Sequence, residues 1–320
     1  MKPLKLILII LMSLILVSSV KPQRLLTADD ESNYQKIGQE YAKRYFAPLT
    51  TGLGIIMGSG FIGGYSPLEF KKSLVSPHVY IGIKYCQVLN NKMDNSFDMK
   101  FKSKMTFNDT TVQVNWTVKG APTVFGNISP AVANGRFSIY GIQKDTTVQL
   151  IGGSGVSALS PLYIPHIGIG TFFGTDFIIR GFPGVNVGSY GRLSLYGGSI
   201  RHNFSSYIKM PFDVALQGGF QNMKVERGGE KFLTANSYFF NIQFNKRLAF
   251  LSLYAGAQFE DYTMNVYYEY DGVKLPFTQK PETPFRAIFG LTLSIGPLKV
   301  NSDMSYCQKF AFTGGIGMGL

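Results

Sequence analysis

The run PFDVALQGGFQ, residues 211–221, decides the fold because its side chains alternate in character. One set is apolar or small: Phe212, Val214, Leu216, Gly218 and Phe220. The other set is mostly polar: Asp213, Ala215, Gln217, Gly219 and Gln221. Successive side chains of a strand point to opposite faces, so this spacing predicts a strand with one apolar and one polar face.

The same alternation recurs through residues 210–320, in runs long enough to cross a membrane. We therefore expect apolar faces toward lipid and polar faces toward a lumen. In residues 262–270 the expected outward residues are Tyr262, Met264, Val266, Tyr268 and Tyr270. The predicted lumen-facing residues are Asp213, Gln217, Asn241, Gln243, Asn265, Glu269, Asn301 and Asp303. A polar interior needs many such residues, and none of them stands out as a specific binding site.

The composition fits this class. Charged residues make up 16% of the 320 residues, aromatic residues make up 14%, and 36 residues are glycine. Ordinary domains have about 25% charged residues and about 7% glycine. A soluble β-sandwich would need more charge on its outer surface. The scarcity of charge therefore favours a barrel in lipid.

The first residues form an expected secretory signal, residues 1–19. Lys2 and Lys5 precede the apolar run Leu6–Val17, and Val17 and Ser19 suit a small-residue cleavage site. About twelve apolar residues are too few for a spanning helix, which needs about 20. We find no longer apolar run after residue 20, so the sequence predicts an exported chain that is either soluble or a barrel.

Residues 20–77 are predicted to form a helix and a plug. Aromatic and aliphatic residues recur at helical spacing over residues 32–46, and Pro48 is expected to end the helix. The following Gly52–Gly60 segment is glycine-rich but lacks the lysine and the preceding strand of a phosphate-binding loop. We expect it to block the lumen. The predicted apolar, substrate-binding residues of this plug are Tyr41, Tyr45, Ile55, Ile56 and Met57.

Residues 78–320 are predicted to form the barrel. The first strand is expected at residues 78–89, with Val79, Ile81 and Ile83 toward lipid and Lys84 and Cys86 inward. Further strands are expected at residues 97–102, 112–118, 136–142 and 146–151, and residues 119–160 are the least regular part. In residues 190–200, Leu193 and Leu195 are expected to point outward. The fold class is thus all-β: a transmembrane antiparallel barrel of about fourteen strands, with twelve to sixteen as the range and an even number expected.

Removal of Lys2 and Lys5 with the signal leaves 29 basic and 19 acidic residues, a net charge of +10. The basic residues are scattered, which favours contacts with anionic outer-membrane lipids and lipopolysaccharide over an anion-attracting lumen. No nucleic-acid motif is present. Cys86 and Cys307 are the only cysteines, and their predicted strands are too far apart for a disulfide, so we expect free thiols.

Catalytic patterns are weak. His78, His166 and His202 are too dispersed for a metal site, and no cofactor motif occurs. Ser206 and Lys209 have the spacing of one hydrolase motif, but its companion motifs are absent. We expect no enzyme. A barrel hydrolase using Ser206, His202 and Asp213 is the less favoured alternative.

The run PHIGIGTFFGTDFIIRGFP, residues 165–183, resembles the signature of an uncharacterised outer-membrane barrel family of Bacteroidota-type bacteria. Further matches are Ala47-Pro48-Leu49, Met210–Asp213 with Gln217-Gly218-Gly219, and the Gly290–Leu293 strand. The resemblance covers most of the mature chain, although residues 90–160 match poorly. Its overall plan is similar to that of the long-chain fatty-acid transporter barrels.

That resemblance implies passive passage of small hydrophobic molecules across the outer membrane, past a plug. The alternative is a structural or secretion-associated outer-membrane barrel without transport. The sequence leaves both open.

Overall fold

The computed structural model describes residues 28–63, 75–89, 92–107, 110–155, 159–186, 191–207, 210–270 and 273–319. The predicted signal at residues 1–19 and the C-terminal Leu320 lie outside them. Contacts divide the chain into two units. We call Thr51–Leu89, Leu159–Asn265 and Gln279–Leu320 the barrel unit, and Met1–Thr50, Asn90–Ala158 and Val266–Thr278 the sheet unit.

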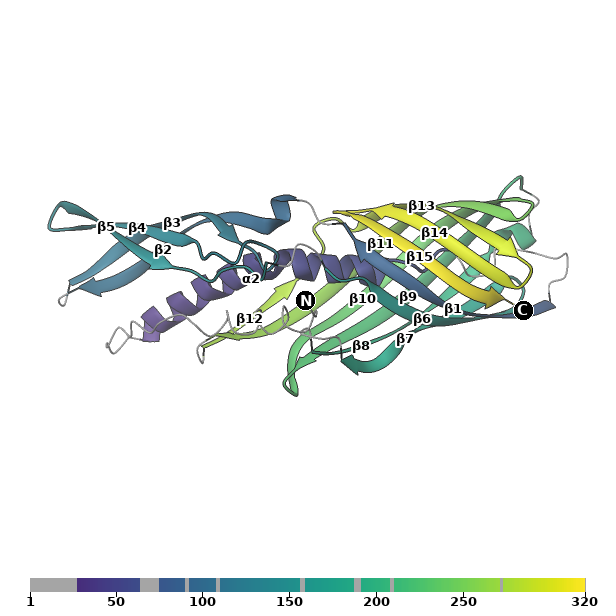
Figure 1. The fold of residues 1–320 in the computed structure, drawn as a ribbon, viewed down its shortest axis with the longest axis horizontal. Coiled ribbons are helices and arrows are strands. Elements are labelled where there is room, and N and C mark those ends of the chain that lie inside the picture. Colours follow the sequence, from purple (N-terminus) through teal and green to yellow (C-terminus); the bar gives the residue numbers. More distant parts are fainter. Residues whose placement is uncertain are drawn as a thin grey trace, which may run out of the picture. The chain divides into compact units, whose positions relative to one another are not determined.

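Ten antiparallel strands close into a barrel (Figure 1). Their order is β10-β9-β8-β7-β6-β1-β15-β14-β13-β11, and pairing of β10 with β11 closes the ring. The bounds are β1 Val75–Val88, β6 Leu162–Phe172, β7 Thr175–Asn186, β8 Arg192–Asn203, β9 Asp213–Arg227, β10 Glu230–Leu248, β11 Leu251–Tyr270, β13 Phe285–Ile295, β14 Leu298–Tyr306 and β15 Phe310–Gly319. An eleventh strand, β12 Val273–Gln279, pairs with β11 outside the ring. A short 3-10 helix, η3 Phe204–Ser206, follows β8.

The expectation of about fourteen barrel strands is therefore wrong. Residues 96–149 do form strands, but these make a separate sheet in the order β2-β3-β4-β5. Their bounds are β2 Ser96–Phe107, β3 Thr110–Pro122, β4 Val132–Ile139 and β5 Ile142–Gln149, after the 3-10 helix η1 Lys92–Asn95. The sheet has its own apolar core around Trp116, whose indole donates to Ser103 Oγ at 2.8 Å. Alternation alone does not say which sheet a strand joins.

The helix α2 runs from Ala28 to Gly58, so Pro48 lies inside it and does not end it. Proline has no N–H, and the carbonyl of the residue four positions earlier loses its usual partner. Packing on both sides of this point outweighs that loss. Tyr41 contacts Phe97 in the sheet unit, while Gly54 lies against Tyr262 in the barrel unit. In the part of the chain that the structure describes, no helix is both long enough and apolar enough to span a membrane.

The first barrel strand has the predicted faces. Val79, Ile81 and Ile83 are exposed on the outside, and Lys84 and Cys86 are buried on the inside. Cys86 and Cys307 are both free, as expected.

Along β8, β9, β10 and β11 the apolar side chains change from the outer face of the barrel wall to its inner face. In one half of these strands the outer residues are apolar and exposed: Ile200, Phe220, Phe240 and Leu253. The inner residues there are polar and buried: Ser199, Gln217, Asn241 and Gln258. In the other half the outer residues are polar: Ser194, Asn222, Asn236 and Asp261. The inner residues there are apolar and buried: Leu195, Met223, Leu233 and Met264.

This exchange overturns two assignments of face. Leu193 and Leu195 point inward, and so do Tyr262, Met264 and Val266, all of them buried. Alternation predicts that the apolar side faces lipid all along each strand, but this side faces inward wherever the outer surface is polar, as in a soluble protein.

Candidate functional site: a polar network around the helix end

The last turns of α2, residues 51–58, belong to the barrel unit and lie against inward-facing side chains. Glycines make this close approach possible. A Cβ added at Gly54 would overlap the ring of Tyr262, and one at Gly58 would overlap the carboxylate of Glu260. The glycine-rich segment that resembles a phosphate-binding loop is thus a helix end packed against strand β11.

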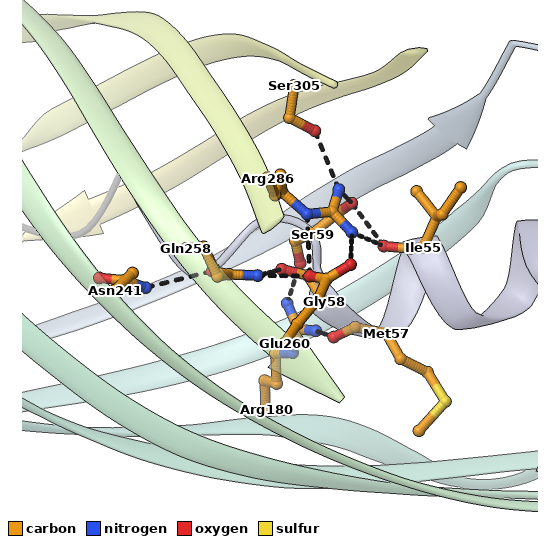
Figure 2. Close-up of polar contacts among 10 residues, drawn as sticks. All are labelled: Ile55, Met57, Gly58, Ser59, Arg180, Asn241, Gln258, Glu260, Arg286 and Ser305. Carbon is orange, nitrogen blue, oxygen red and sulfur yellow. Dashed lines mark hydrogen bonds and ion pairs between the residues drawn. The ribbon is translucent and has the colours of Figure 1, made fainter. Parts of the chain in front are cut away.

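Three side chains of the barrel satisfy the last carbonyl groups of this helix (Figure 2). Arg286 Nη2 donates to Ile55 O at 2.9 Å, and Gln258 Nε2 donates to Gly58 O at 2.9 Å. Arg180 donates to Met57 O at 2.6 Å and to Ser59 O at 2.5 Å. A helix leaves its last four carbonyls without partners inside the helix, and cations there also interact favourably with the helix dipole. The arginines therefore cap the helix inside the barrel.

Arg286 is fully paired. Its guanidinium meets Glu260 through two bonds, from Nε at 2.9 Å and from Nη2 at 2.7 Å. Its Nη1 also donates to Ser59 Oγ at 2.8 Å and to Ser305 Oγ at 3.0 Å. Both partners of the ion pair are almost completely buried. A bidentate pair with its remaining donors satisfied is the arrangement that tolerates burial.

Arg180 differs, because it meets neutral acceptors. Besides the two carbonyls, it donates to Gln221 Oε1, and its Cζ lies 3.5 Å from the ring centroid of Phe61. The helix carbonyls and the aromatic face therefore supply the negative potential around this buried cation.

Amide side chains extend the network around the barrel wall. Gln243 donates to Asn241 at 2.8 Å, Asn241 donates to Gln258 at 3.2 Å, and Gln258 donates to Glu260 at 2.7 Å. Gln217 donates to Ser199 at 2.8 Å. These residues come from neighbouring strands, so the network ties the wall to the helix end.

The same interior holds four further charged groups: Arg201, Asp176, Asp303 and Lys84. Arg201 binds Asp176 at 2.9 Å through Nε and at 2.5 Å through Nη2. Tyr254 donates to Asp303 at 2.9 Å. The buried Lys84 donates to Ile62 O at 3.4 Å, just beyond the helix. The interior around the helix end is thus polar and is occupied by the protein's own groups.

The predicted plug residues fall into two groups. Ile55, Ile56 and Met57 are buried in the barrel unit, with 1%, 1% and 0% of their surface exposed. Tyr41 and Tyr45 lie in the sheet unit, where their hydroxyls donate to Ile151 O at 3.5 Å and to Gly152 O at 3.2 Å. The two groups of plug residues thus belong to different units.

Six of the eight predicted lumen residues are on inward-facing positions. Gln217, Asn241, Gln243, Asn301 and Asp303 are buried, and Asp213 is half-buried at the start of β9. Asn265 and Glu269 are on the opposite side of β11 from the buried Tyr262 and Met264, and Glu269 is exposed. Alternation predicts these two residues to face inward, which is wrong because the polar side of β11 faces outward in this half of the strand.

Sequence reasoning missed the residues that hold the helix: Arg180, Gln258, Glu260 and Arg286. The sequence did indicate that Arg180 and Arg286 are unusual, because both are charged residues on the polar side of a predicted strand in a chain with few charges. Their partners could not be inferred, because the carbonyls that they bind are more than 120 residues away in the sequence.

The three histidines have separate neighbours in the structure. His78 is 3.5 Å from Asp176, His202 Nδ1 is 2.9 Å from Thr175 Oγ1, and His166 is beside Tyr80. The Ser206 side chain and Lys209 are outside the described residues. Within the described ranges, no group of three metal-ligating side chains is found.

The fold and the site together define a closed antiparallel β-barrel that has an apolar exterior and a polar interior in the part that surrounds its own helix end. The chain belongs to a family of unknown function, DUF6588, which matches residues 1–320. No curated protein matches it.

Several solved structures are similar to the chain at low identity. One is a loop-deletion mutant of OmpT, an outer-membrane protein of Vibrio cholerae, at 10% identity and a TM-score of 0.28, covering 77% of this chain and 99% of that one. Another is the β domain of the Bordetella autotransporter BrkA, at 10% identity and a TM-score of 0.33, with the same coverage. LpxR of Salmonella typhimurium has 7% identity and a TM-score of 0.28, covering 75% and 99%. At these scores the likenesses carry no argument about function.

Proposed function

We propose that this protein is an outer-membrane β-barrel whose lumen is closed by its own helix end. The observation that carries the proposal is the capping of residues 55–59 by Arg180, Arg286 and Gln258 inside the barrel. Closed barrels satisfy every strand hydrogen bond internally, which lipid requires. The exposed apolar side chains on the outside suit contact with outer-membrane lipids and lipopolysaccharide. The predicted export signal supports the same location.

Aromatic residues on the outer surface support a membrane position. One exposed group lies at the level where the outer faces of β8–β11 change from apolar to polar. The shorter strands end near this level, and their aromatic residues there belong to the same group. Its members are Tyr163, Tyr196, Tyr238, Phe259, Phe285, Tyr306 and Phe310. A second exposed group lies at the opposite ends of the strands: Phe173, Phe204, Tyr207, Phe212 and Phe250. Outer-membrane barrels carry such aromatic girdles at both interfaces. From Phe250 of the second group to Phe259 of the first, the chain counts ten residues, which fits the 9–11 residues of a spanning strand.

Conductance in planar bilayers tests the closure. The unmodified protein should show no steady open channel. The double variant Arg180→Ala and Arg286→Ala, which removes the caps of the helix end, should show channel openings. Arg136→Ala, at an exposed arginine of the sheet unit, is the matched control and should stay closed. Steady conductance of the unmodified protein would show that the lumen is open and would contradict the proposal.

The second candidate is passive uptake of small hydrophobic molecules, with the helix end moving aside. It is favoured by the apolar residues of the helix end and of the chain just after it. Phe61 packs on Phe239 with ring centroids 4.2 Å apart, and Ile62 clusters with Tyr254 and Ile288. We also propose a Bacteroidota-type origin, which rests on residues 165–183, and a distant kinship with long-chain fatty-acid transporter barrels, which rests on the overall plan of a barrel with an N-terminal plug.

Uptake of a fluorescent fatty acid by proteoliposomes tests this candidate. Ile56→Asn should lower the rate, whereas Ile142→Asn, at an exposed site of the sheet unit, should not. Equal uptake rates in the unmodified protein, Ile56→Asn and Ile142→Asn would exclude a role of the helix end in uptake. We propose no catalytic activity. Ester hydrolysis that is lost in Ser206→Ala would contradict that.

A further inference from the structure

The chain inside the barrel runs in one direction along β11. Gly54 lies against Tyr262, Gly58 against Glu260, and Gly63 against Tyr254. Gly256 of β11 lies against Ile62, at a level between Glu260 and Tyr254. As the residue number rises from 54 to 63, the partner on β11 falls from 262 to 254. The segment therefore proceeds toward Leu251, where β11 begins.

We name the two ends of the barrel by their connections. At the end where β11 begins, β10 and β11 are joined by residues 249–250, β6 and β7 by residues 173–174, and β13 and β14 by residues 296–297. This is the turn end, and β15 also finishes there. At the other end, the loop end, residues 89–161 separate β1 from β6 and residues 271–284 separate β11 from β13.

Strand β1 starts at the turn end, since Val75 pairs with Phe172 beside the 173–174 turn. Gly63 has reached the level of Tyr254, close to the same end. The chain thus enters the lumen at the loop end as helix α2, passes along the interior, and returns to the loop end as β1. Residues N-terminal to Thr51 are connected to the barrel only through the loop end.

The outer surface shows which end extends into water. The polar outer faces of β8–β11, with Asn222 and Asn236 exposed and bonded to each other at 2.6 Å, belong to the loop-end half of these strands. Strands β10 and β11 have 19 and 20 residues, about twice the length needed to cross a bilayer. The surplus projects from the membrane at the loop end.

Outer-membrane barrels have short turns on the periplasmic side and longer loops outside the cell. At the turn end three of the four connections have two residues, the exception being residues 204–212 between β8 and β9, and β15 also finishes there. At the loop end residues 228–229 between β9 and β10 and residues 307–309 between β14 and β15 are short, but residues 89–161 and 271–284 are longer than any connection at the turn end. This difference and the projecting strands assign the turn end to the periplasm and the loop end to the cell exterior.

From these directions we propose that the chain passes outward through its own barrel and displays the sheet unit, with the first half of α2, at the cell surface. This rests on the proposed outer-membrane location. The barrel is then a holder for a surface-exposed β-sheet unit, with the helix as the link through the lumen.

Labelling of intact cells with a membrane-impermeant maleimide tests the display. Both native cysteines are buried, so the unmodified chain gives the background. Four single variants place a thiol at an exposed position: Lys43→Cys on α2, Gln143→Cys on β5, Arg227→Cys at the loop end and Pro297→Cys at the turn end. The first three should be labelled several-fold above background in intact cells. Pro297→Cys should be labelled only after the outer membrane is permeabilised.

The outcomes separate the two proposals. If only Pro297→Cys is labelled in intact cells, the orientation is the reverse of the proposed one. That result would overturn the proposed display and leave the proposed closed barrel intact. Labelling of Arg227→Cys without Lys43→Cys and Gln143→Cys would overturn the passage of the chain through the lumen. Recovery of the protein outside the outer-membrane fraction would instead refute the proposed location.

Discussion

The Arg286 guanidinium is the most connected group in the barrel, with bonds to Glu260, Ser59, Ser305 and Ile55 O. Arg286→Met should lower the free energy of unfolding by about 3–5 kcal/mol, because Glu260 is left as a buried, unpaired charge. Glu260→Gln in the same chain should restore much of that loss. Unfolding in urea, followed by the heat-dependent gel mobility of the barrel, measures each variant. Strictly additive losses in the double variant would contradict the pairing.

Tyr45 provides a pH-dependent prediction. Burial raises the pKa of Tyr45 to about 12, and its hydroxyl donates to Gly152 O. The folded pKa is above the unfolded value of 10.0, so this contribution to stability is complete below pH 10 and is lost as the pH rises toward 12. The slope from one such group is about 1.4 kcal/mol per pH unit.

The measurement is urea unfolding of the sheet unit at pH 8 and pH 11. Tyr45→Phe has no ionisable hydroxyl, so it should be less stable at pH 8 yet lose less on going to pH 11. The pKa of Tyr41 is raised in the same direction by burial, so part of the pH dependence should persist in Tyr45→Phe. An equal loss in both chains would contradict the role of Tyr45.

Among the elements, the end of α2 depends on glycine. Gly58→Ala should displace the helix, because the added Cβ would overlap the Glu260 carboxylate. We expect a loss of about 1–3 kcal/mol, as for other overpacked sites. Gly218→Ala is the control, since the nearest atom to its Cβ would be 3.8 Å away. Gel mobility in urea compares the two, and equal midpoints would show that the helix end is not tightly packed.

Strand existence could be predicted well, and strand partners could not. Alternation predicted β1 with its correct faces and strands that overlap β2, β3 and β5, whereas the strand predicted at residues 136–142 crosses the turn between β4 and β5. It assigned β2–β5 to the barrel because a strand pattern carries no information on its neighbours. The barrel of ten strands is smaller than expected for that reason.

Under the proposed membrane location, the inward direction of Leu195 and Met264 depends on where the membrane lies along each strand, which alternation does not reveal. An apolar residue points toward lipid where lipid is present and toward the core where water surrounds the strand. The contacts of Arg180 and Arg286 were also beyond reach, since they depend on where the helix ends within the barrel.

At the scale of the whole molecule, the two units should unfold separately. Trp116 is the only tryptophan and is buried in the core of the sheet unit. Its fluorescence should change at a lower urea concentration than the gel mobility of the barrel, because a closed ring of strands is the more extensively hydrogen-bonded structure. Coincident transitions by both probes would contradict independent units.

The enclosure of the helix end has a consequence for the order of assembly. The ring joins its first and last strands, since β1 pairs with β15 from Tyr80–Gly319 to Val88–Ala311. The side chains of the helix end, among them Ile55, Ile56 and Met57, are buried in the barrel unit, so little room is left for this segment to enter along the lumen of a closed ring. We therefore expect the helix end to reach the interior before β1 meets β15. The pairing of these two strands is then the step that commits the protein to its final state.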